Sequence, residues 1–495
     1  MAGSQILSTV KYVAGTKKVF FLSEISEYLD VPMTVDKMYA ILQPHLLPLG
    51  LDAKRSGKDY EISRIKPGPA YTMSAAEEKC LETYLAETTF PPSLEEAIKQ
   101  YITRKTGKPW SDPAILDRLR QAIVAQKNDY WKPTEKRTLQ YTKGYSVLGY
   151  LVYHFPVYFM QTRHLLAILA REGLLKQEMN VLDLGTGPGV IPLAIADFWK
   201  CVGRAKVNVW TLERSKEHIE AFEYLLKNTT KKNPGVTINS PAQADITSPK
   251  NISLPPCDLI VFSNVLNELT GFSEDSRADL VMEYAKSLSP DGSILIVEPA
   301  EEVTATGLRI LALALKKRGL TIYAPCVFIW GTNCTPDRCW SFTTAHSIKP
   351  TELMNTLSMC EEPFRYVNTD IKYSYVILRK DAKKRHSCSL TKSSKATRLS
   401  RLHLKSGNRI SVTVAKMSEN LGNNKNYVFK ICDGSAEKPV YAILPSFHTT
   451  ASNRTLVTAP YGTVLEISDV HVRFNPAHQA FNVLVTRNSR ASLAK

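Results

Sequence analysis

The sequence has no apolar run of the roughly 18 residues that a membrane-spanning helix requires. A secretory signal is also missing, because Met1–Lys18 carries three lysines but no continuous apolar core before a cleavage site. We therefore expect no membrane segment and a cytoplasmic protein. The segment before Glu24 has no acidic residue, as in organellar transit peptides, but also no arginine. A mitochondrial location is the alternative expectation.

Acidic residues are scarce relative to basic ones. The 47 Asp and Glu oppose 63 Lys and Arg, which gives a net charge of +16 and indicates an acidic partner. The imbalance is greatest from Arg379 to Arg409, where Asp381 is the one acid. A solvated linker would tolerate this composition, but one-sided charge favours a phosphate-binding arm with RNA as its partner. The basic residues inside this stretch are Lys380, Lys383, Lys384, Arg385, Lys392, Lys395, Arg398, Arg401 and Lys405.

A chain of 495 residues is too long for a single core. Its patterns change several times, and the central part alternates apolar strands with amphipathic helices, which predicts an α/β sheet. The predicted units are a winged-helix-like domain or helical adaptor at 1–68, a helical cap at 69–178, a Rossmann-like domain at 179–380, a basic linker at 381–400, and a small β-barrel of oligonucleotide-binding (OB) type, or a β-sandwich, at 401–495.

Three alternating glycines follow the first predicted strand of the central domain. Asp183 stands at the strand end, and Gly185, Thr186, Gly187 and Gly189 form the turn into a helix. Glycine allows a nucleotide-like ligand to approach the backbone closely. The order G-x-G-x-G after an acid differs from the G-x-G-x-x-G of dinucleotide-binding proteins and favours S-adenosylmethionine over NAD. The predicted fold is that of a class I S-adenosylmethionine-dependent methyltransferase.

Polar residues end the following strands too. Glu213 is placed to accept hydrogen bonds from both ribose hydroxyls of the cofactor, and Asp245 from its adenine amine. After the fourth strand, Asn264, Asn267 and Glu268 are the candidate catalytic residues, and Asn264 also a candidate cofactor contact. Asp245 and Asn267 could instead cap helices.

A conspicuous nucleophile is absent, as is the Asn-Pro-Pro-aromatic loop that positions amino groups in many base methyltransferases. Methyl transfer from a sulfonium needs mainly in-line positioning and, for a neutral amine, a way to lose a proton. The missing loop argues against methylation of an exocyclic amine. Cys257 precedes its strand, so we interpret it as buried packing.

Three of the nine cysteines, Cys326, Cys334 and Cys339, share one loop within residues 323–342. Disulfides are not expected in a cytosolic protein. Three thiolates in a loop indicate a zinc or iron–sulfur site that needs a fourth ligand, unless the three are unrelated. The spacing does not identify that fourth ligand.

Together these motifs resemble the small ribosomal subunit methyltransferase-like family, whose mitochondrial members act in assembly of the small subunit. The resemblance covers roughly residues 145–435 and implies a methyltransferase-like protein that acts on small-subunit ribosomal RNA or in subunit assembly. The alternatives are a non-catalytic iron–sulfur RNA-binding assembly factor and a protein methyltransferase. The matching pieces are Val181–Gly189, Ser263–Leu269, Val297–Pro299, Tyr323–Cys326, Cys334, Cys339–Phe342, Tyr373–Leu378 and Ile431–Gly434.

The resemblance also implies that Cys432, before an Asp-Gly pair, is the fourth cysteine ligand and that the group is a [4Fe-4S] cluster. Zinc is the chemical alternative for four thiolates. The chain departs from the family pattern in having Cys326-Val327-Phe328 instead of Cys-Pro-His, and His154-Phe155-Pro156 instead of Arg-x-Pro. The sequence predicts no oligomeric state.

Overall fold

The N-terminal unit packs three helices on a small antiparallel sheet. The computed structural model describes residues 2–130, 132, 144–229, 233–249, 252, 254–331, 334–386 and 396–494. The unit has its own core, which includes Ile6, Val10, Leu42 and Ile62. The winged-helix-like arrangement is confirmed, and strand β1 was not predicted. Its elements are α1 (Ala2–Thr16), β1 (Val19–Phe21), α2 (Ser23–Ser26), α3 (Val35–Leu46), β2 (Leu51–Ser56) and β3 (Asp59–Arg64), with the strand order β1-β3-β2.

A run of helices leads from this unit to the central sheet. The first begins at Ser74, whose side chain accepts from the amide of Glu77 while Glu77 bonds back to the Ser74 amide. Among the described residues no helix is long and apolar enough to cross a membrane. The helices are α4 (Ala75–Ala86), α5 (Pro92–Thr106), α6 (Pro113–Tyr130), α7 (Tyr145–Tyr153) and α8 (Phe155–Arg171).

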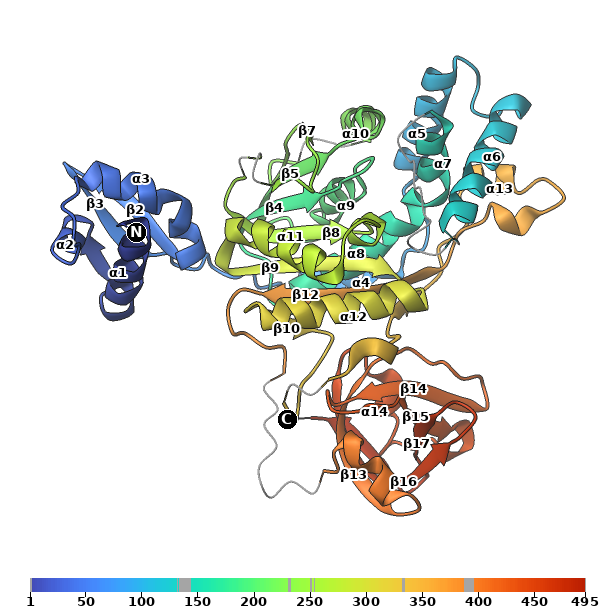
Figure 1. Ribbon diagram of the computed structural model, residues 1–495. Helices are drawn as coiled ribbons and strands as arrows, with labels where there is room; N and C mark the ends of the chain where they lie inside the picture. The colour runs from blue at the N-terminus through green and yellow to red at the C-terminus, as the bar shows by residue number, and fades with distance from the viewer. Residues whose placement is uncertain are drawn as a thin grey trace.

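The central sheet has the strand order β10-β12-β9-β8-β4-β5-β6, with β12 antiparallel to both of its neighbours (Figure 1). This is the order of class I methyltransferases, so the predicted fold class is confirmed. The strands are β4 (Glu178–Leu184), β5 (Lys206–Glu213), β6 (Val236–Ile238), β8 (Cys257–Ser263), β9 (Leu288–Pro299), β10 (Thr321–Ala324) and β12 (Ile371–Arg379), with β7 (Ala242–Gln243) and β11 (Thr343–Ala345) paired at the side.

Helices cover both faces of this sheet and bury two separate apolar clusters. One cluster joins the sheet to α8, α9 (Val190–Phe198) and α10 (Lys216–Thr229). The other joins it to α11 (Glu274–Tyr284) and α12 (Glu302–Lys317). Helix α13 (Glu352–Leu357) packs near α7. The helices follow their strands, so the loops after β4, β5, β8 and β9 gather at one edge of the sheet.

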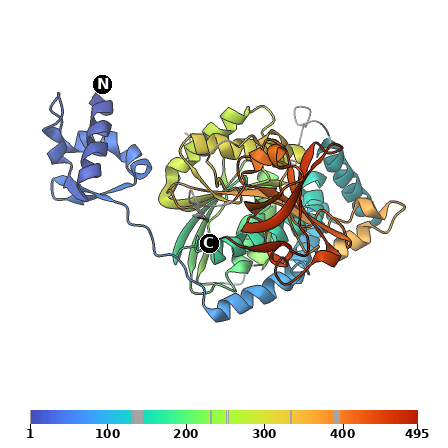
Figure 2. The same ribbon diagram turned by 90° about the horizontal axis from the view of Figure 1, so that it is seen from below.

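The C-terminal unit is a closed five-stranded barrel with a sixth strand added to β16. Strand β13 pairs with both β14 and β16, which closes the ring, and β15 runs parallel to β17. This topology is that of an OB barrel and decides against the β-sandwich. Figure 2 shows the barrel against the central domain, with the N-terminal unit to one side. The elements are β13 (Arg409–Lys416), β14 (Asn426–Cys432), β15 (Val440–Pro445), α14 (Thr455–Thr458), β16 (Val464–Asn475), β17 (Ala480–Leu484) and β18 (Arg490–Leu493).

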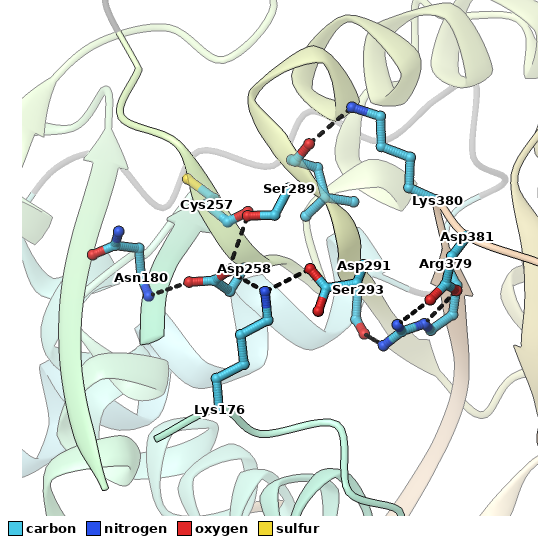
Figure 3. Close-up of polar contacts among 11 residues, drawn as sticks. Lys176, Asn180, Cys257, Asp258, Ser289, Asp291, Ser293, Arg379, Lys380 and Asp381 are labelled. Carbon is cyan, nitrogen blue, oxygen red and sulfur yellow. Dashed lines mark hydrogen bonds and ion pairs between the residues drawn. The ribbon is translucent and has the colours of Figure 1, made fainter. Parts of the chain in front are cut away.

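A buried ion-pair network closes the opposite edge of the sheet (Figure 3). Lys176 Nζ lies 2.7 Å from a carboxylate oxygen of both Asp258 and Asp291. Asp258 also accepts from the Asn180 amide at 2.9 Å and from the Ser289 hydroxyl at 2.9 Å. These partners come from β4, β8, β9 and the segment before β4. The network therefore fixes the amino-terminal ends of the three strands relative to one another and has a structural role.

The start of the basic arm belongs to the protein interior. Arg379 pairs with Asp381 and donates to the Ser293 hydroxyl (Figure 3). Lys380 donates to the carbonyl of Ala285, just after α11, and to that of Leu288, at the start of β9. Arg385 pairs with Glu172. The expectation that these three cations bind phosphate is therefore wrong, because each has an internal partner. Lys383, Lys384, Arg401 and Lys405 are exposed, and Lys392 and Lys395 lie outside the described residues.

Candidate cofactor cleft and cysteine cluster

A cleft of about 120 Å³ opens at the carboxyl ends of β4, β5 and β8. The strand order places the three strand ends side by side, as the sequence predicted. Six of the residues proposed from sequence line the cleft: Gly185, Gly187, Glu213, Asp245, Asn264 and Glu268. Asp183, Thr186, Gly189 and Asn267 are not part of its lining, and their positions give each a different role.

Each of the three positions in the turn requires glycine for a different physical reason. All three have positive φ values, which side chains rarely adopt. A Cβ on Gly185 would lie 2.6 Å from Val265, and one on Gly189 would lie 2.1 Å from the Phe222 ring. A Cβ on Gly187 would meet only His218, at 3.9 Å. Gly189 is thus needed for packing of α9 on α10, and Gly187 leaves open space at the cleft.

Asp183 is buried at the end of β4 and stabilises the glycine turn that follows. The Thr186 hydroxyl donates to Asp183 Oδ2 at 2.5 Å, and Asp183 is 1% exposed. Burial raises the pKa of this carboxyl to about 7. Asp183 and Thr186 therefore stabilise the conformation of the glycine turn without lining the cleft.

Glu213 connects the end of β5 to the glycine turn. Its two carboxylate oxygens accept from the Gly187 amide at 2.9 Å and from the Ser215 amide at 2.7 Å. A carboxylate has about four lone-pair sites, so two remain for the hydroxyls of a ribose. His218 Nδ1 lies 4.0 Å from Glu213, and burial lowers the pKa of this histidine.

The loop after β8 divides its polar residues between two sides. Asn264 adopts a left-handed conformation (φ 54°), and its amide donates to the Val297 carbonyl at 2.8 Å. Glu268 lines the cleft, whereas the Asn267 amide donates to buried Glu298 at 3.2 Å. Asp245 lines the cleft and also accepts from the Thr247 amide and hydroxyl, as a turn cap does.

Sequence reasoning missed several residues of the cleft wall. Tyr150, Arg214, Ser215, His218 and Val265 line it together with the expected residues. The aromatic density of residues 150–158 is compatible with either core packing or a cleft wall, and the sequence alone favours the core. Tyr150 lies in the wall, while its neighbour Tyr153 is buried. The aromatic density around Tyr150 is visible in the sequence. Only the orientation of helix α7 in the structure shows that Tyr150 lies in the cleft wall.

The cysteine loop meets the barrel at a small cavity of about 20 Å³. Cys326, Cys334, Cys339 and Cys432 all line it, although Cys432 ends strand β14 of the barrel. Cys360, which is nearer along the chain than Cys432, is exposed and does not line this cavity. The Gly434 amide donates to Cys432 Sγ at 3.3 Å. The eight described cysteines are free thiols.

The donor set around this cavity suits a soft metal ion or cluster. Arg309 reaches the same cavity and lies 4.0 Å from Cys326 Sγ, and its buried Nε has no hydrogen-bond partner. An unpaired cationic donor among thiols fits a group that carries negative charge. Among the described residues, however, no set of three or more His, Cys, Asp or Glu side chains is arranged to hold a metal ion.

Sequence comparison matches three regions of the chain to protein families. Residues 144–438 match the family described as "Mitochondrial small ribosomal subunit Rsm22". Residues 3–57 and 400–494 match the N-terminal and C-terminal domains of a "Domain of unknown function (DUF8157)". No curated protein matches the chain by sequence.

Solved methyltransferases are among the structural neighbours. An S-adenosylmethionine-dependent methyltransferase from Clostridium acetobutylicum is 16% identical, with 28% of this chain and 49% of that chain covered and a TM-score of 0.22. One from Aquifex aeolicus is 19% identical, with coverages of 32% and 80% and a TM-score of 0.25. NSun6 from Pyrococcus horikoshii is 13% identical, with coverages of 46% and 52% and a TM-score of 0.28. The chain thus spans about half the length of the first and third. Its methyltransferase fold is established by its own strand order.

Proposed function

Because the chain belongs to the mitochondrial small ribosomal subunit Rsm22 family, we propose that it is an S-adenosylmethionine-dependent methyltransferase-like protein of small-subunit ribosome assembly, with small-subunit ribosomal RNA as its target. The observation that carries the proposal is the hydrogen bond between the Gly187 amide and Glu213. It joins the glycine turn and the ribose-binding carboxylate in one cleft, at the strand ends where α/β sheets bind ligands.

In this proposal each cleft residue binds one part of the cofactor. Gly185 and Gly187 let the backbone approach it, Glu213 accepts from its ribose hydroxyls, and Asp245 accepts from its adenine amine. Asp183, Thr186 and Gly189 keep the turn in shape from outside the cleft. Asn264 contacts the amino-acid part of the cofactor and borders the acceptor.

The proposed catalytic residues act by positioning. Asn264 and Glu268 face the cleft and orient the acceptor toward the sulfonium methyl group, and Glu268 accepts the proton when the acceptor is a neutral amine. Asn267 holds the loop in place through Glu298. No covalent intermediate is required.

Calorimetric titration with S-adenosylmethionine tests the cofactor site. Replacing Glu213 by Ala removes the ribose acceptor, and we expect the affinity to fall at least tenfold. Glu178→Ala is the matched control, because Glu178 is an exposed carboxylate at the other end of β4. Equal affinities for wild type and Glu213→Ala would remove the basis of the cofactor proposal.

Transfer of labelled methyl from S-adenosylmethionine to small-subunit ribosomal RNA tests activity. A second candidate function, a non-catalytic RNA-binding assembly factor, is favoured by the closed OB barrel, since such barrels bind oligonucleotides without chemistry. Intact cofactor binding without methyl transfer to any small-subunit RNA or protein would select this second function.

Cys326, Cys334, Cys339 and Cys432 are proposed to hold a [4Fe-4S] cluster, with zinc as the alternative. The support is that all four line one cavity. Such a group ties the barrel to the central domain, and an iron–sulfur cluster adds redox sensitivity. Iron, zinc and sulfide contents of anaerobically purified wild type and Cys432→Ser distinguish the two groups, and a metal-free wild type rejects both.

The RNA-binding surface is proposed to combine the barrel with exposed Lys383, Lys384, Arg401 and Lys405. The family description names the mitochondrion, which agrees with the second of the two locations expected from sequence. Fractionation of the cells that produce the protein decides between mitochondrion and cytoplasm.

A further inference from the structure

Three aromatic side chains reach the surface from the otherwise buried helices α7 and α8. Residues 147–160 are buried at every position but three, and the exceptions, Tyr150, His154 and Tyr158, are partly exposed. The His154 amide donates to the Tyr150 carbonyl at 2.9 Å, and the Tyr158 amide to the His154 carbonyl at 3.0 Å. These helical hydrogen bonds across the junction of α7 and α8 keep the three side chains on one face.

The three rings pack against one another and form one ring cluster. The His154 ring stacks on that of Tyr158, with 5.6 Å between the centroids and 23° between the planes. The Tyr150 ring lies 5.5 Å from that of His154 and 6.2 Å from that of Tyr158. Burial lowers the pKa of His154 to about 4, so all three rings are uncharged at neutral pH.

The ring cluster borders the cofactor cleft. Tyr150 lines the cleft, and its ring lies 5.8 Å from that of His218, which also lines it. Burial raises the pKa of Tyr158, and the charges of Glu301 and Glu268 add to the rise, so its hydroxyl lies near the loops after β9 and β8. The cluster thus extends the cleft wall toward the loop that carries the proposed catalytic residues.

A cation lines the same cleft. Arg214 is exposed and, within the part of the chain that the structure describes, forms no ion pair. S-adenosylmethionine has no phosphate, and its adenine and amino-acid parts are assigned above to Asp245 and Asn264. The ring cluster and Arg214 are therefore left for a second molecule. Flat neutral rings beside an unpaired cation suit a nucleotide, whose base stacks and whose phosphate accepts from arginine.

We propose that the ring cluster binds an unpaired base of the RNA by stacking, and that Arg214 binds a neighbouring phosphate. A paired base exposes only its edges, so the base must leave the duplex or come from a single strand. The net charge of +16 favours RNA over a protein acceptor. The inference rests on the proposed function, because it names how the protein holds the RNA beside the cofactor.

Proton NMR titration of uridine and cytidine 5′-monophosphate with the full chain tests the proposal. The protein is first saturated with S-adenosylhomocysteine, which keeps the nucleotides out of the adenosine site. Stacking on the ring cluster should move the ring protons of the bound base upfield. Ribose 5-phosphate, which has no base, should bind more weakly by a factor of about five or more.

Three substitutions separate the ring from the charge. Tyr158→Leu removes one ring and should weaken nucleotide binding by a factor of about five or more, whereas Tyr158→Phe keeps the ring and should bind as wild type does. Arg214→Gln should weaken binding of the nucleotides but not of uridine and cytidine. Tyr145→Leu is the matched control and should change neither, because Tyr145 is a partly exposed residue of α7 whose ring contacts Arg118 instead.

Unchanged affinity for S-adenosylhomocysteine shows that each variant is folded. Equal nucleotide binding by Tyr158→Leu and wild type, or no upfield shift with wild type, would overturn the proposal. So would binding of N-acetyltyrosine amide in place of the nucleotides, which would indicate a protein acceptor. If Tyr158→Leu lost S-adenosylhomocysteine affinity without a lower unfolding temperature, the rings would belong to the cofactor site. Failure of wild type to bind S-adenosylhomocysteine would instead count against the proposed function.

Discussion

The thiol groups of Cys80 and Cys201 lie 2.9 Å apart, although 121 residues separate them in the chain. Cys80 is on helix α4, and Cys201 follows α9. Cys80 is exposed, whereas Cys201 is buried and burial raises its pKa to about 12. Hydrogen peroxide should thus oxidise Cys80 first, to a sulfenic acid and water. The Cys201 thiol then displaces water and forms the disulfide.

This disulfide should stabilise the protein by about 3–5 kcal/mol, because it closes a long loop of the unfolded chain. Mass spectrometry of peptides from peroxide-treated protein, without reduction, should find the Cys80–Cys201 link, and thermal unfolding should show a higher midpoint. Cys80→Ser should abolish both effects, and Cys360→Ser, at another exposed cysteine, should abolish neither. A link from Cys80 to a different cysteine would contradict the prediction.

Two glycines of the same turn should respond differently to substitution. Gly189→Ala places a methyl group 2.1 Å from the Phe222 ring and at an unfavourable φ of 88°. We expect the free energy of unfolding to fall by about 2–5 kcal/mol, the sum of the costs of overpacking and of left-handed strain. Gly187→Ala introduces only the left-handed backbone strain, so its free energy of unfolding should fall by about 1–2 kcal/mol. Urea unfolding followed by circular dichroism measures both, and equal losses would show that Phe222 moves aside freely.

The stability of the protein should depend on pH through Glu298. Burial raises the pKa of this carboxyl to about 8 in the folded protein, from an ordinary value of 4.5. A raised pKa means that the folded state holds the proton more tightly, so the stabilisation is complete below pH 4.5 and disappears as the pH rises through 8. A tenfold difference in proton affinity between the folded and unfolded states corresponds to about 1.4 kcal/mol, so the total contribution is up to about 4–5 kcal/mol.

Glu298→Gln keeps the shape but cannot ionise, so its stability should change less between pH 5 and pH 9 than that of wild type. Asp183, whose pKa is raised to about 7, contributes a slope of the same sign, and its effect stays in both proteins. Unfolding free energies from urea titrations at several pH values make the comparison. Parallel curves for the two proteins would contradict the assignment to Glu298.

The sheet and the cleft could be predicted from sequence because short-range signals specify them. The strand at Asn180–Leu184, the turn at Gly185–Gly189 and Glu213 at the end of β5 each combine an apolar run with an abrupt polar end. For the OB barrel, the sequence predicts only a pattern of short strands. Its closure depends on the pairing of Val412 with Ile467, which no local pattern reveals.

The cations of residues 379–385 illustrate what sequence cannot decide. A run of Lys and Arg has the same composition whether its members face solvent or the interior. Arg385 is internal because Glu172, far away in the chain, lies beside it. In the same way, Asn267 and Glu268 are adjacent in sequence but line different cavities. Such assignments depend on tertiary contacts.

Arg309 should control the attachment of the barrel to the central domain. Its guanidinium donates to the Tyr375 carbonyl at 2.9 Å and the Ser374 hydroxyl at 2.8 Å in β12. It also donates at 3.2 Å to the Tyr461 hydroxyl of the barrel. Arg309→Lys cannot reach all three partners, and leaving them unpaired should cost at least about 3 kcal/mol.

Limited proteolysis measures this attachment. Arg309→Lys should release the barrel as a fragment faster than wild type, while S-adenosylmethionine affinity stays within threefold, because the cleft is at another part of the sheet. Arg318→Lys is the control, since Arg318 makes its ion pairs on the surface of α11. An unchanged cleavage rate would mean that other contacts hold the barrel.

Exposed and internal cations of the basic arm should differ in their effect on RNA binding. Lys383 and Lys384 are exposed, so the double replacement by Ala should weaken binding to single-stranded RNA and lower the slope of log affinity against log salt by about 1–1.5. Lys380 is internal, where burial lowers its pKa to about 8. Lys380→Met should leave the slope unchanged. Lys206→Ala, at an exposed lysine of the central domain, controls for net charge. If Lys380→Met changed the slope as much as the double variant did, the division of the arm would be wrong, because an internal cation releases no counterions.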